Sequence, residues 1–185
     1  SATGNNANRI TVSNCKLSGG YYGLSIYGAS TTSFVKGFVL TGNEFVDQYY
    51  YGIRAYYVDS VVAVENTVSG FRNTFGYGYY GFYNSNINLK QNQFFAPTYG
   101  VYMSQLNTAN ATINSEFSNN FIGGGTYGLY ITTYSKLNVY HNSFGGGTAG
   151  YYSFTPNGSV DIRNNIFAGV TSYAFYSSTA PTTGF

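Results

Sequence analysis

Side chains able to perform acid–base chemistry are scarce in this sequence, which has six Asp and Glu residues and one His among 185 residues. Glu116 and Asp161 fall at equivalent outward positions of two repeats, which are described below. Strand spacing would put these carboxylates about 10 Å apart, near the wide limit for the acid and base of an inverting glycosidase. Arg163 follows Asp161 closely, and His141 lies at a corner between the two acids. An ion pair and a solvated acid explain this group more simply, so we keep catalysis as an alternative.

The sequence has 22 tyrosines, whose side chains could bind a ligand. Five tyrosines recur at one outward position of successive repeats, after Ser25 and Arg54 in the first two repeats. Sugar C–H faces pack on aromatic rings, and phenol hydroxyls can hydrogen-bond to sugar hydroxyls. The pattern predicts a polysaccharide-binding strip, but a ladder that only stabilises stacking, or one covered by another domain, has the same pattern. The members of this predicted column are Tyr83, Tyr102, Tyr130, Tyr152 and Tyr176.

Charge and composition exclude several classes of function. The net charge is +2 and the Lys and Arg residues are scattered, so no nucleic-acid partner is expected. No run of about eighteen apolar residues predicts a membrane span, and the start lacks the pattern of a retained signal peptide. The single Cys15 excludes an internal disulfide and a thiolate metal cluster, and no cofactor or metal is expected. Low charge with abundant Tyr, Asn, Gly, Ser and Thr indicates an extracellular or cell-surface protein.

Two motifs repeat seven times along the chain. The first is apolar-x-apolar-x-x-Asn-x-apolar, and its Asn position is occupied by Cys15, Asn43, Asn66, Asn92, Asn120, Asn142 and Asn165. The second usually begins with Tyr-Gly, and we place its glycine at Gly23, Gly52, Gly81, Gly100, Gly128 and Gly150, with Ala174 in the last copy. We expect the tyrosines before these positions to pack at corners: Tyr22, Tyr51, Tyr80, Tyr99, Tyr127 and Tyr173. Two motifs that keep one order and nearly one spacing indicate a repeat fold.

Each repeat contains short segments with period-two alternation and none long enough for a crossover helix. Parallel strands must then return through further strands, which is the geometry of a β-solenoid. We expect each Asn to adopt a left-handed corner and to bond the Asn one coil away, and each Gly to form another corner. The sequence therefore predicts an all-β, parallel β-helix of about seven coils over residues 10–177. Three longer excursions, 27–37, 69–79 and 104–114, are candidates for a binding edge.

The Asn and Gly columns resemble those of the right-handed parallel β-helix repeat family, the pectate-lyase-like solenoids. This resemblance covers residues 10–177 and implies a right-handed solenoid, in line with the general preference of parallel crossovers. It implies a fold and no particular function. The Asp clusters with which pectate-lyase-like enzymes bind calcium have no counterpart in the Asn column.

We therefore predict one β-helix domain over residues 1–185. Its short terminal segments do not look able to cap a solenoid, so we expect a segment of a larger protein, neighbouring domains or end-to-end self-association. The preferred function is a non-catalytic extracellular or cell-surface module that binds, or is displayed against, polysaccharide through the tyrosine column. The alternatives are a polysaccharide lyase or glycoside hydrolase, and a purely structural surface spacer or adhesin stalk.

Overall fold

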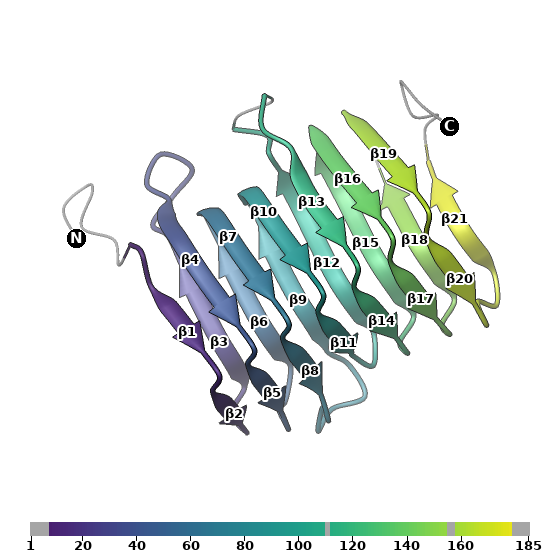
Figure 1. Ribbon diagram of the computed structural model, residues 1–185, viewed down its shortest axis with the longest axis horizontal. Helices are drawn as coiled ribbons and strands as arrows, with labels where there is room; N and C mark the ends of the chain where they lie inside the picture. The colour runs from purple at the N-terminus through teal and green to yellow at the C-terminus, as the bar shows by residue number, and fades with distance from the viewer. Residues whose placement is uncertain (1–7, 110–111, 155–157, 179–185) are drawn as a thin grey trace.

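The computed structural model describes residues 8–109, 112–154 and 158–178, which form 21 strands and no helix. The strands lie in three parallel sheets of seven, and each coil of the chain contributes one strand to each sheet (Figure 1). Each strand pairs with its equivalents in the adjacent coils, on both sides in the five inner coils and on one side in the first and last. The expected all-β parallel solenoid of seven coils is confirmed.

The three sheets differ in strand length. Sheet 1 contains β1 (Thr11–Ser13), β4 (Val35–Thr41), β7 (Val58–Val64), β10 (Ser85–Lys90), β13 (Ser115–Ser118), β16 (Lys136–Tyr140) and β19 (Ser159–Arg163). Sheet 2 contains the short strands β2 (Lys16–Ser18), β5 (Glu44–Val46), β8 (Thr67–Ser69), β11 (Gln93–Phe95), β14 (Phe121–Gly123), β17 (Ser143–Gly145) and β20 (Ile166–Ala168). Sheet 3 contains β3 (Tyr22–Tyr27), β6 (Tyr51–Tyr56), β9 (Tyr77–Phe82), β12 (Tyr99–Leu106), β15 (Tyr127–Tyr134), β18 (Ala149–Phe154) and β21 (Tyr173–Ser177).

Side chains alternate between inward and outward along the strands, and the inward ones form a continuous apolar core between the three sheets. Leu89 of sheet 1, Phe94 of sheet 2 and Val101 of sheet 3 are all fully buried, and equivalent residues of neighbouring coils stack on them. The predicted outward positions of sheet 1 are in register from coil to coil; one such column contains Asn88, Glu116, Asn138 and Asp161. The short-period alternation in the sequence was therefore sufficient to orient sheet 1.

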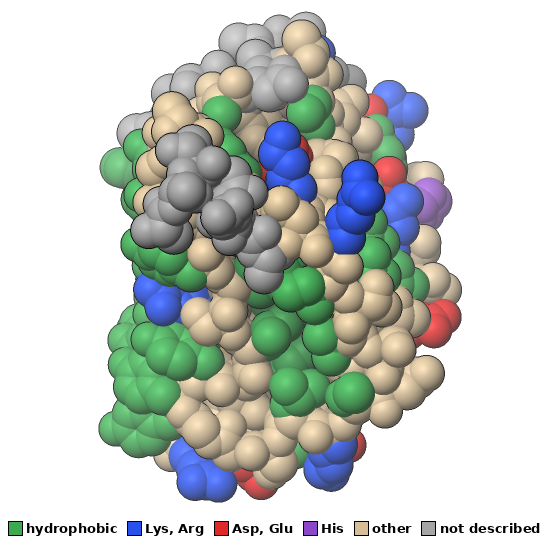
Figure 2. Space-filling model, turned by 90° about the vertical axis from the view of Figure 1, so that its left-hand side faces the viewer, with side chains coloured by type: hydrophobic (Ala, Val, Ile, Leu, Met, Phe, Trp, Pro, Cys, Tyr) green, Lys and Arg blue, Asp and Glu red, His purple; other side chains and the backbone are tan. Residues whose placement is uncertain are grey.

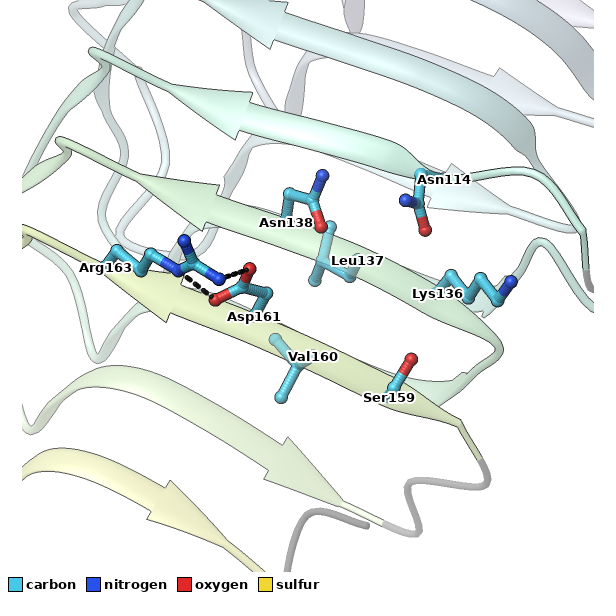
Figure 3. A pocket seen from close by; sticks show the side chains of 8 residues that line it. All are labelled: Asn114, Lys136, Leu137, Asn138, Ser159, Val160, Asp161 and Arg163. Carbon is cyan, nitrogen blue, oxygen red and sulfur yellow. Dashed lines mark hydrogen bonds and ion pairs between the residues drawn. The ribbon is translucent and has the colours of Figure 1, made fainter. Parts of the chain in front are cut away.

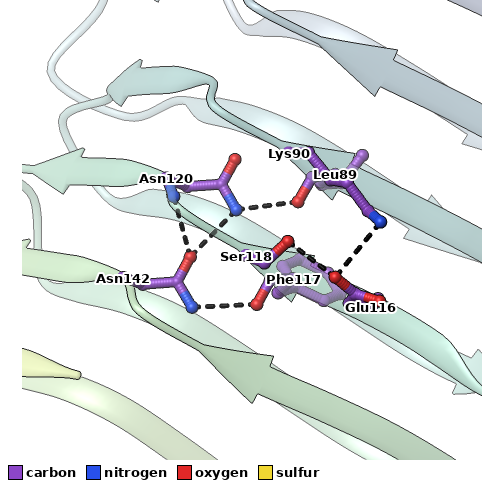
Figure 4. A network of polar contacts seen from close by, with 7 residues as sticks. All are labelled: Leu89, Lys90, Glu116, Phe117, Ser118, Asn120 and Asn142. Carbon is purple, nitrogen blue, oxygen red and sulfur yellow. Dashed lines mark hydrogen bonds and ion pairs between the residues drawn. The ribbon is translucent and has the colours of Figure 1, made fainter. Parts of the chain in front are cut away.

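A buried ladder of asparagines joins the coils at the corner between sheets 1 and 2 (Figure 4). The Asn120 backbone N–H and Nδ2 both donate to Asn142 Oδ1 at 2.9 Å, and Nδ2 also donates to the Leu89 carbonyl at 2.8 Å. Cys15 occupies the first position, where its N–H donates to Asn43 Oδ1 at 3.0 Å. The ladder satisfies buried backbone groups that the turn would otherwise leave unpaired.

The left-handed conformation at this corner belongs to a different residue from the one predicted. Gln91, Asn119 and His141, each directly before a ladder Asn, have φ of 56°, 56° and 57°. No ladder Asn within the described ranges has a positive φ. The left-handed residue makes the turn, and the Asn after it is thereby directed into the core, where its amide is needed.

Glycines at the corner between sheets 2 and 3 are required by close packing. Gly128 has no positive φ, but a Cβ on it would lie 2.6 Å from the Gly150 carbonyl oxygen and 2.7 Å from the Phe144 ring. The third coil uses Gly78 at this position, not Gly81 as predicted. The column is therefore Gly23, Gly52, Gly78, Gly100, Gly128 and Gly150, followed by Ala174.

The longer connections do not lie along a single edge of the rod. Residues 28–34 and 107–114 both link sheet 3 to sheet 1, although residues 110–111 are outside the described ranges. Residues 70–76 instead link sheet 2 to sheet 3. At the first coil, the core opens into an apolar hollow of about 290 Å³ lined by residues such as Ile10, Leu24 and Phe38. Figure 2 looks onto this end of the rod and shows hydrophobic side chains in its middle.

Candidate functional site on the tyrosine face

The outer surface of sheet 3 carries two adjacent columns of tyrosines, which together we call the tyrosine face. The central column, which follows Ser25 and Arg54 in strand register, is Tyr80, Tyr102, Tyr130, Tyr152 and Tyr176. The flanking column is Tyr22, Tyr51, Tyr77, Tyr99, Tyr127 and Tyr173, with Ala149 in the sixth coil.

Two tyrosines per coil face outward because strand alternation is interrupted once. In β12, Gly100 and Val101 are consecutive and both buried, so Tyr99 before them and Tyr102 after them are both partly exposed. The same pattern of burial recurs in β6, β9 and β15. The flanking tyrosines, which we expected to pack only at corners, therefore widen the aromatic surface.

The structure places Tyr80, and not Tyr83, in the central column. Tyr83 follows β9 at the corner that leads to sheet 1, where it has a φ of 50° and stacks on Tyr57 at 5.5 Å. The sequence offers two Tyr-Gly pairs in this coil, and the structure uses Gly78, twelve residues after Asn66. In the other coils the interval is eight or nine residues, so the shorter interval was the signal that could have identified the correct pair.

The rings form a regular herringbone arrangement. Neighbours in the central column from Tyr80 to Tyr176 are 4.4–5.4 Å apart with planes within 6–16° of each other. Rings of different columns meet edge to face, as Tyr99 and Tyr102 do at 5.4 Å and 78°. Both geometries are favourable for aromatic pairs. Along each column, neighbouring rings stack on one another and cover their flat surfaces. The tyrosine face therefore offers ring edges and hydroxyls to a ligand, and not the flat ring surfaces that the sequence suggested.

Burial makes several phenols of the tyrosine face weaker acids. Burial, together with smaller effects of neighbouring phenols, raises the pKa of Tyr51 and of Tyr130 to about 12. Burial likewise raises the pKa of Tyr77 and Tyr80. The hydroxyls therefore stay protonated at neutral pH, and each can both donate and accept a hydrogen bond.

The two acids proposed as a catalytic pair lie on sheet 1, in one column with Asn138 between them. Glu116 accepts a hydrogen bond of 2.7 Å from Ser118 Oγ and pairs with Lys90 at 3.2 Å (Figure 4). The Asp161 carboxylate accepts a hydrogen bond of 2.7 Å from the Tyr140 hydroxyl, and Arg163 Nε donates to it at 2.8 Å. The structure therefore gives each acid its own partners.

Both environments favour the charged carboxylate. The hydrogen bond from Tyr140, and then Arg163, lower the pKa of Asp161. The hydrogen bond from Ser118, and then Lys90, lower the pKa of Glu116. A glycosidase needs one of its two carboxyls to have a raised pKa so that it can act as the acid. Neither candidate has the surroundings that this role requires.

A groove of about 340 Å³ lies over β16 and β19 beside the Asp161–Arg163 pair (Figure 3). Lys136, Asn138 and Ser159 line it, but Glu116 does not. His141 lies elsewhere, exposed at the left-handed corner before the Asn ladder. The groove is polar, but it does not bring the predicted catalytic residues together.

Among the residues that the structure describes, no three His, Cys, Asp or Glu side chains are placed to hold a metal ion. The same residues include no helix long and apolar enough to cross a membrane.

Comparison with known proteins defines the family. No protein with a curated description matches the sequence. The crystal structure of PfbA, a surface adhesin of Streptococcus pneumoniae, is similar with a TM-score of 0.71 at 14% identity, over 96% of this chain and 49% of that chain. The chain thus spans about half the length of PfbA, and at this identity the likeness shows the fold alone. Residues 2–144 match the family described as the right-handed beta helix region. The chain therefore belongs to the right-handed β-helix family.

Proposed function

We propose that the chain is a non-catalytic surface module that binds polysaccharide through the tyrosine face. The observation that carries this proposal is the length of the two columns, of which the central one presents a phenol in each of the last five coils. Coils repeat at about 4.8 Å, close to the advance of one hexose along an extended glycan. A polymer lying along the rod would thus meet a similar set of hydroxyls and ring edges at each sugar.

The likeness in fold to a surface adhesin supports an extracellular or cell-surface location. It also supports the proposal that this domain is one segment of a longer surface protein. A polysaccharide lyase or hydrolase has less support, because Glu116 and Asp161 have separate partners and lowered pKa values. A spacer without a ligand would explain the fold and the stacked rings, but not why these rings carry hydroxyls in coil after coil.

The test is a glycan-binding assay with the wild type and a Tyr102→Phe/Tyr130→Phe double variant. Phe keeps the stacked rings, which are 5.4 Å apart, and removes only the two hydroxyls. Each hydroxyl bond is worth about 0.5–1.5 kcal/mol, so the loss of two should weaken binding roughly 5- to 150-fold. The matched control is Tyr57→Phe/Tyr83→Phe, a stacked pair of adjacent coils that lies at a corner outside the tyrosine face.

Three outcomes would decide the matter. Weaker binding by the Tyr102→Phe/Tyr130→Phe variant, with no change in the control, supports the proposal. If the wild type binds no glycan in a broad panel, the proposal is wrong. Release of reducing ends from a polysaccharide by the wild type, lost in Asp161→Asn, would favour the enzyme alternative instead.

A further inference from the structure

We propose that Arg54 binds a carboxylate of the polysaccharide, so that the tyrosine face selects glycans with acidic sugars. This inference rests on the proposed function and names the class of ligand. It begins from a break in the central column: strand register places Arg54 where the next coils have Tyr80 and Tyr102.

Arg54 is held in a cage of aromatic rings. Its guanidinium carbon lies 4.2 Å from the centre of the Tyr56 ring and 5.1 Å from that of Tyr22. The rings of Tyr27 and Tyr51 are both 6.0 Å away. Each contact is within the range of a cation–π interaction. Four rings therefore fix the position of one half-buried cation without neutralising it.

No acidic group pairs with Arg54 in the part of the chain that the structure describes. Within residues 8–109, 112–154 and 158–178, the Arg54 guanidinium takes part in no ion pair or hydrogen bond, and the three ion pairs that form lie on sheets 1 and 2. All six carboxylates of the chain belong to sheets 1 and 2 or to connections outside sheet 3. Arg54 is also the one Lys or Arg on the strands of sheet 3. The tyrosine face thus has a single positive charge and no negative charge.

The chemistry of guanidinium suits a carboxylate ligand. An arginine packed against aromatic rings through its faces keeps its N–H groups free in the plane, and these form a fork that matches a carboxylate with two parallel bonds. The nearby rings also displace water, which strengthens the attraction. A carboxylated sugar at Arg54 would leave the following sugars of the chain on the hydroxyls of Tyr80 and Tyr102. A glycan fits this surface better than an acidic peptide does, because the rest of the face is a run of uncharged hydroxyls.

The experiment compares hyaluronan and alginate oligosaccharides with their carboxyl-reduced derivatives, in which each carboxylate is replaced by an alcohol. The wild type should bind at least one acidic form about 10- to 100-fold more tightly than its reduced form, as expected for one charge-assisted pair. Arg54→Gln should bind both forms equally, and Arg54→Lys should retain part of the preference because it keeps the charge but loses the fork.

The matched control for charge is Lys36→Gln, which removes one exposed cation from the same coil on sheet 1. This variant should keep the full preference for the acidic form. An unfolding curve for each variant shows whether the fold is intact. If Lys36→Gln and Arg54→Gln lose the preference equally, general electrostatics explains it and the assignment to Arg54 is wrong.

Other results separate the two proposals. Equal binding of acidic and reduced forms, lost in Tyr102→Phe/Tyr130→Phe, would overturn the role of Arg54 and leave the proposed function standing. Binding of neither form, nor of any other glycan, would overturn both. Binding of dextran sulfate without the uronates would overturn the carboxylate assignment. Binding of poly-glutamate without the uronates would overturn the choice of a glycan.

Discussion

Removing one rung of the asparagine ladder should destabilise the protein strongly. In the wild type, Asn92 Oδ1 accepts hydrogen bonds from the backbone N–H and from Nδ2 of Asn66, both at 2.9 Å. Asn92 Nδ2 donates to the Ala63 carbonyl at 2.8 Å and to Asn120 Oδ1 at 3.1 Å. Asn92→Ala deletes all four bonds. The Asn66 amide group still donates to the Leu40 and Val64 carbonyls, but the buried backbone N–H of Asn66 loses its acceptor.

The magnitude follows from these contacts. An unsatisfied buried N–H costs about 1–3 kcal/mol, and each other lost bond costs about 0.5–1.5 kcal/mol. The free energy of unfolding should therefore fall by about 2.5–7.5 kcal/mol, a large part of the roughly 5–15 kcal/mol that stabilises a typical domain. Asn88→Ala is the matched control, because Asn88 lies in the same coil but faces outward on sheet 1. Its change should stay within about 0.5 kcal/mol.

Urea unfolding followed by circular dichroism measures both changes. We expect a lower midpoint for Asn92→Ala, and a lower slope if the damaged coil lets the two halves of the solenoid unfold separately. A midpoint equal to that of Asn88→Ala would contradict this prediction, because the hydrogen bonds of the ladder would then contribute nothing to the stability of the fold.

Two further predictions test the sheet 3 side of the rod. Gly128→Ala should lower the free energy of unfolding by about 1–3 kcal/mol, because the new Cβ would clash with the Gly150 carbonyl and the Phe144 ring. Gly145→Ala is the control and should be tolerated, because its Cβ would lie 3.6 Å from the nearest side chain. Equal unfolding midpoints of the two variants would contradict this prediction. Folding raises the pKa of Tyr51 and Tyr130 from 10.0 to about 12. As the pH rises, the unfolded chain therefore loses these protons before the folded chain does. The stability present below pH 10 should then decline between pH 10 and pH 12. Tyrosinate absorbance should then appear together with unfolding, and ordinary titration near pH 10 in an intact fold would count against it.

Most of the fold could be predicted from the sequence because its signals repeat. Alternation gave the inward residues of sheet 1, and the spacing of Asn92, Asn120 and Asn142 gave the coils. The residue with the left-handed backbone could not be inferred from composition, because Asn is common both in the ladder and at the preceding corner. Asn119 and Asn120 illustrate the difficulty: they are neighbours of one type, yet the first makes the turn and the second enters the core.

The candidate site was only partly predictable. Strand alternation identified Tyr102, Tyr130 and Tyr152 as outward residues, and these lie in the central column. It could not predict the flanking column, because two consecutive inward residues at the glycine corner depend on how the neighbouring coil packs. The aromatic cage of Arg54 combines two rings of the preceding coil with two rings of its own strand, so its prediction required the three-dimensional register.

The stacked columns also make the protein its own optical reporter. The chain has 22 tyrosines and no tryptophan, so no indole collects the excitation energy and its ultraviolet emission comes from phenols. Rings about 5 Å apart in near-parallel pairs exchange excitation readily, so light absorbed at one tyrosine migrates along the column before it is emitted. A ligand that quenches a single ring would therefore dim the emission of many, and the polarisation of the emitted light would report whether the column is intact.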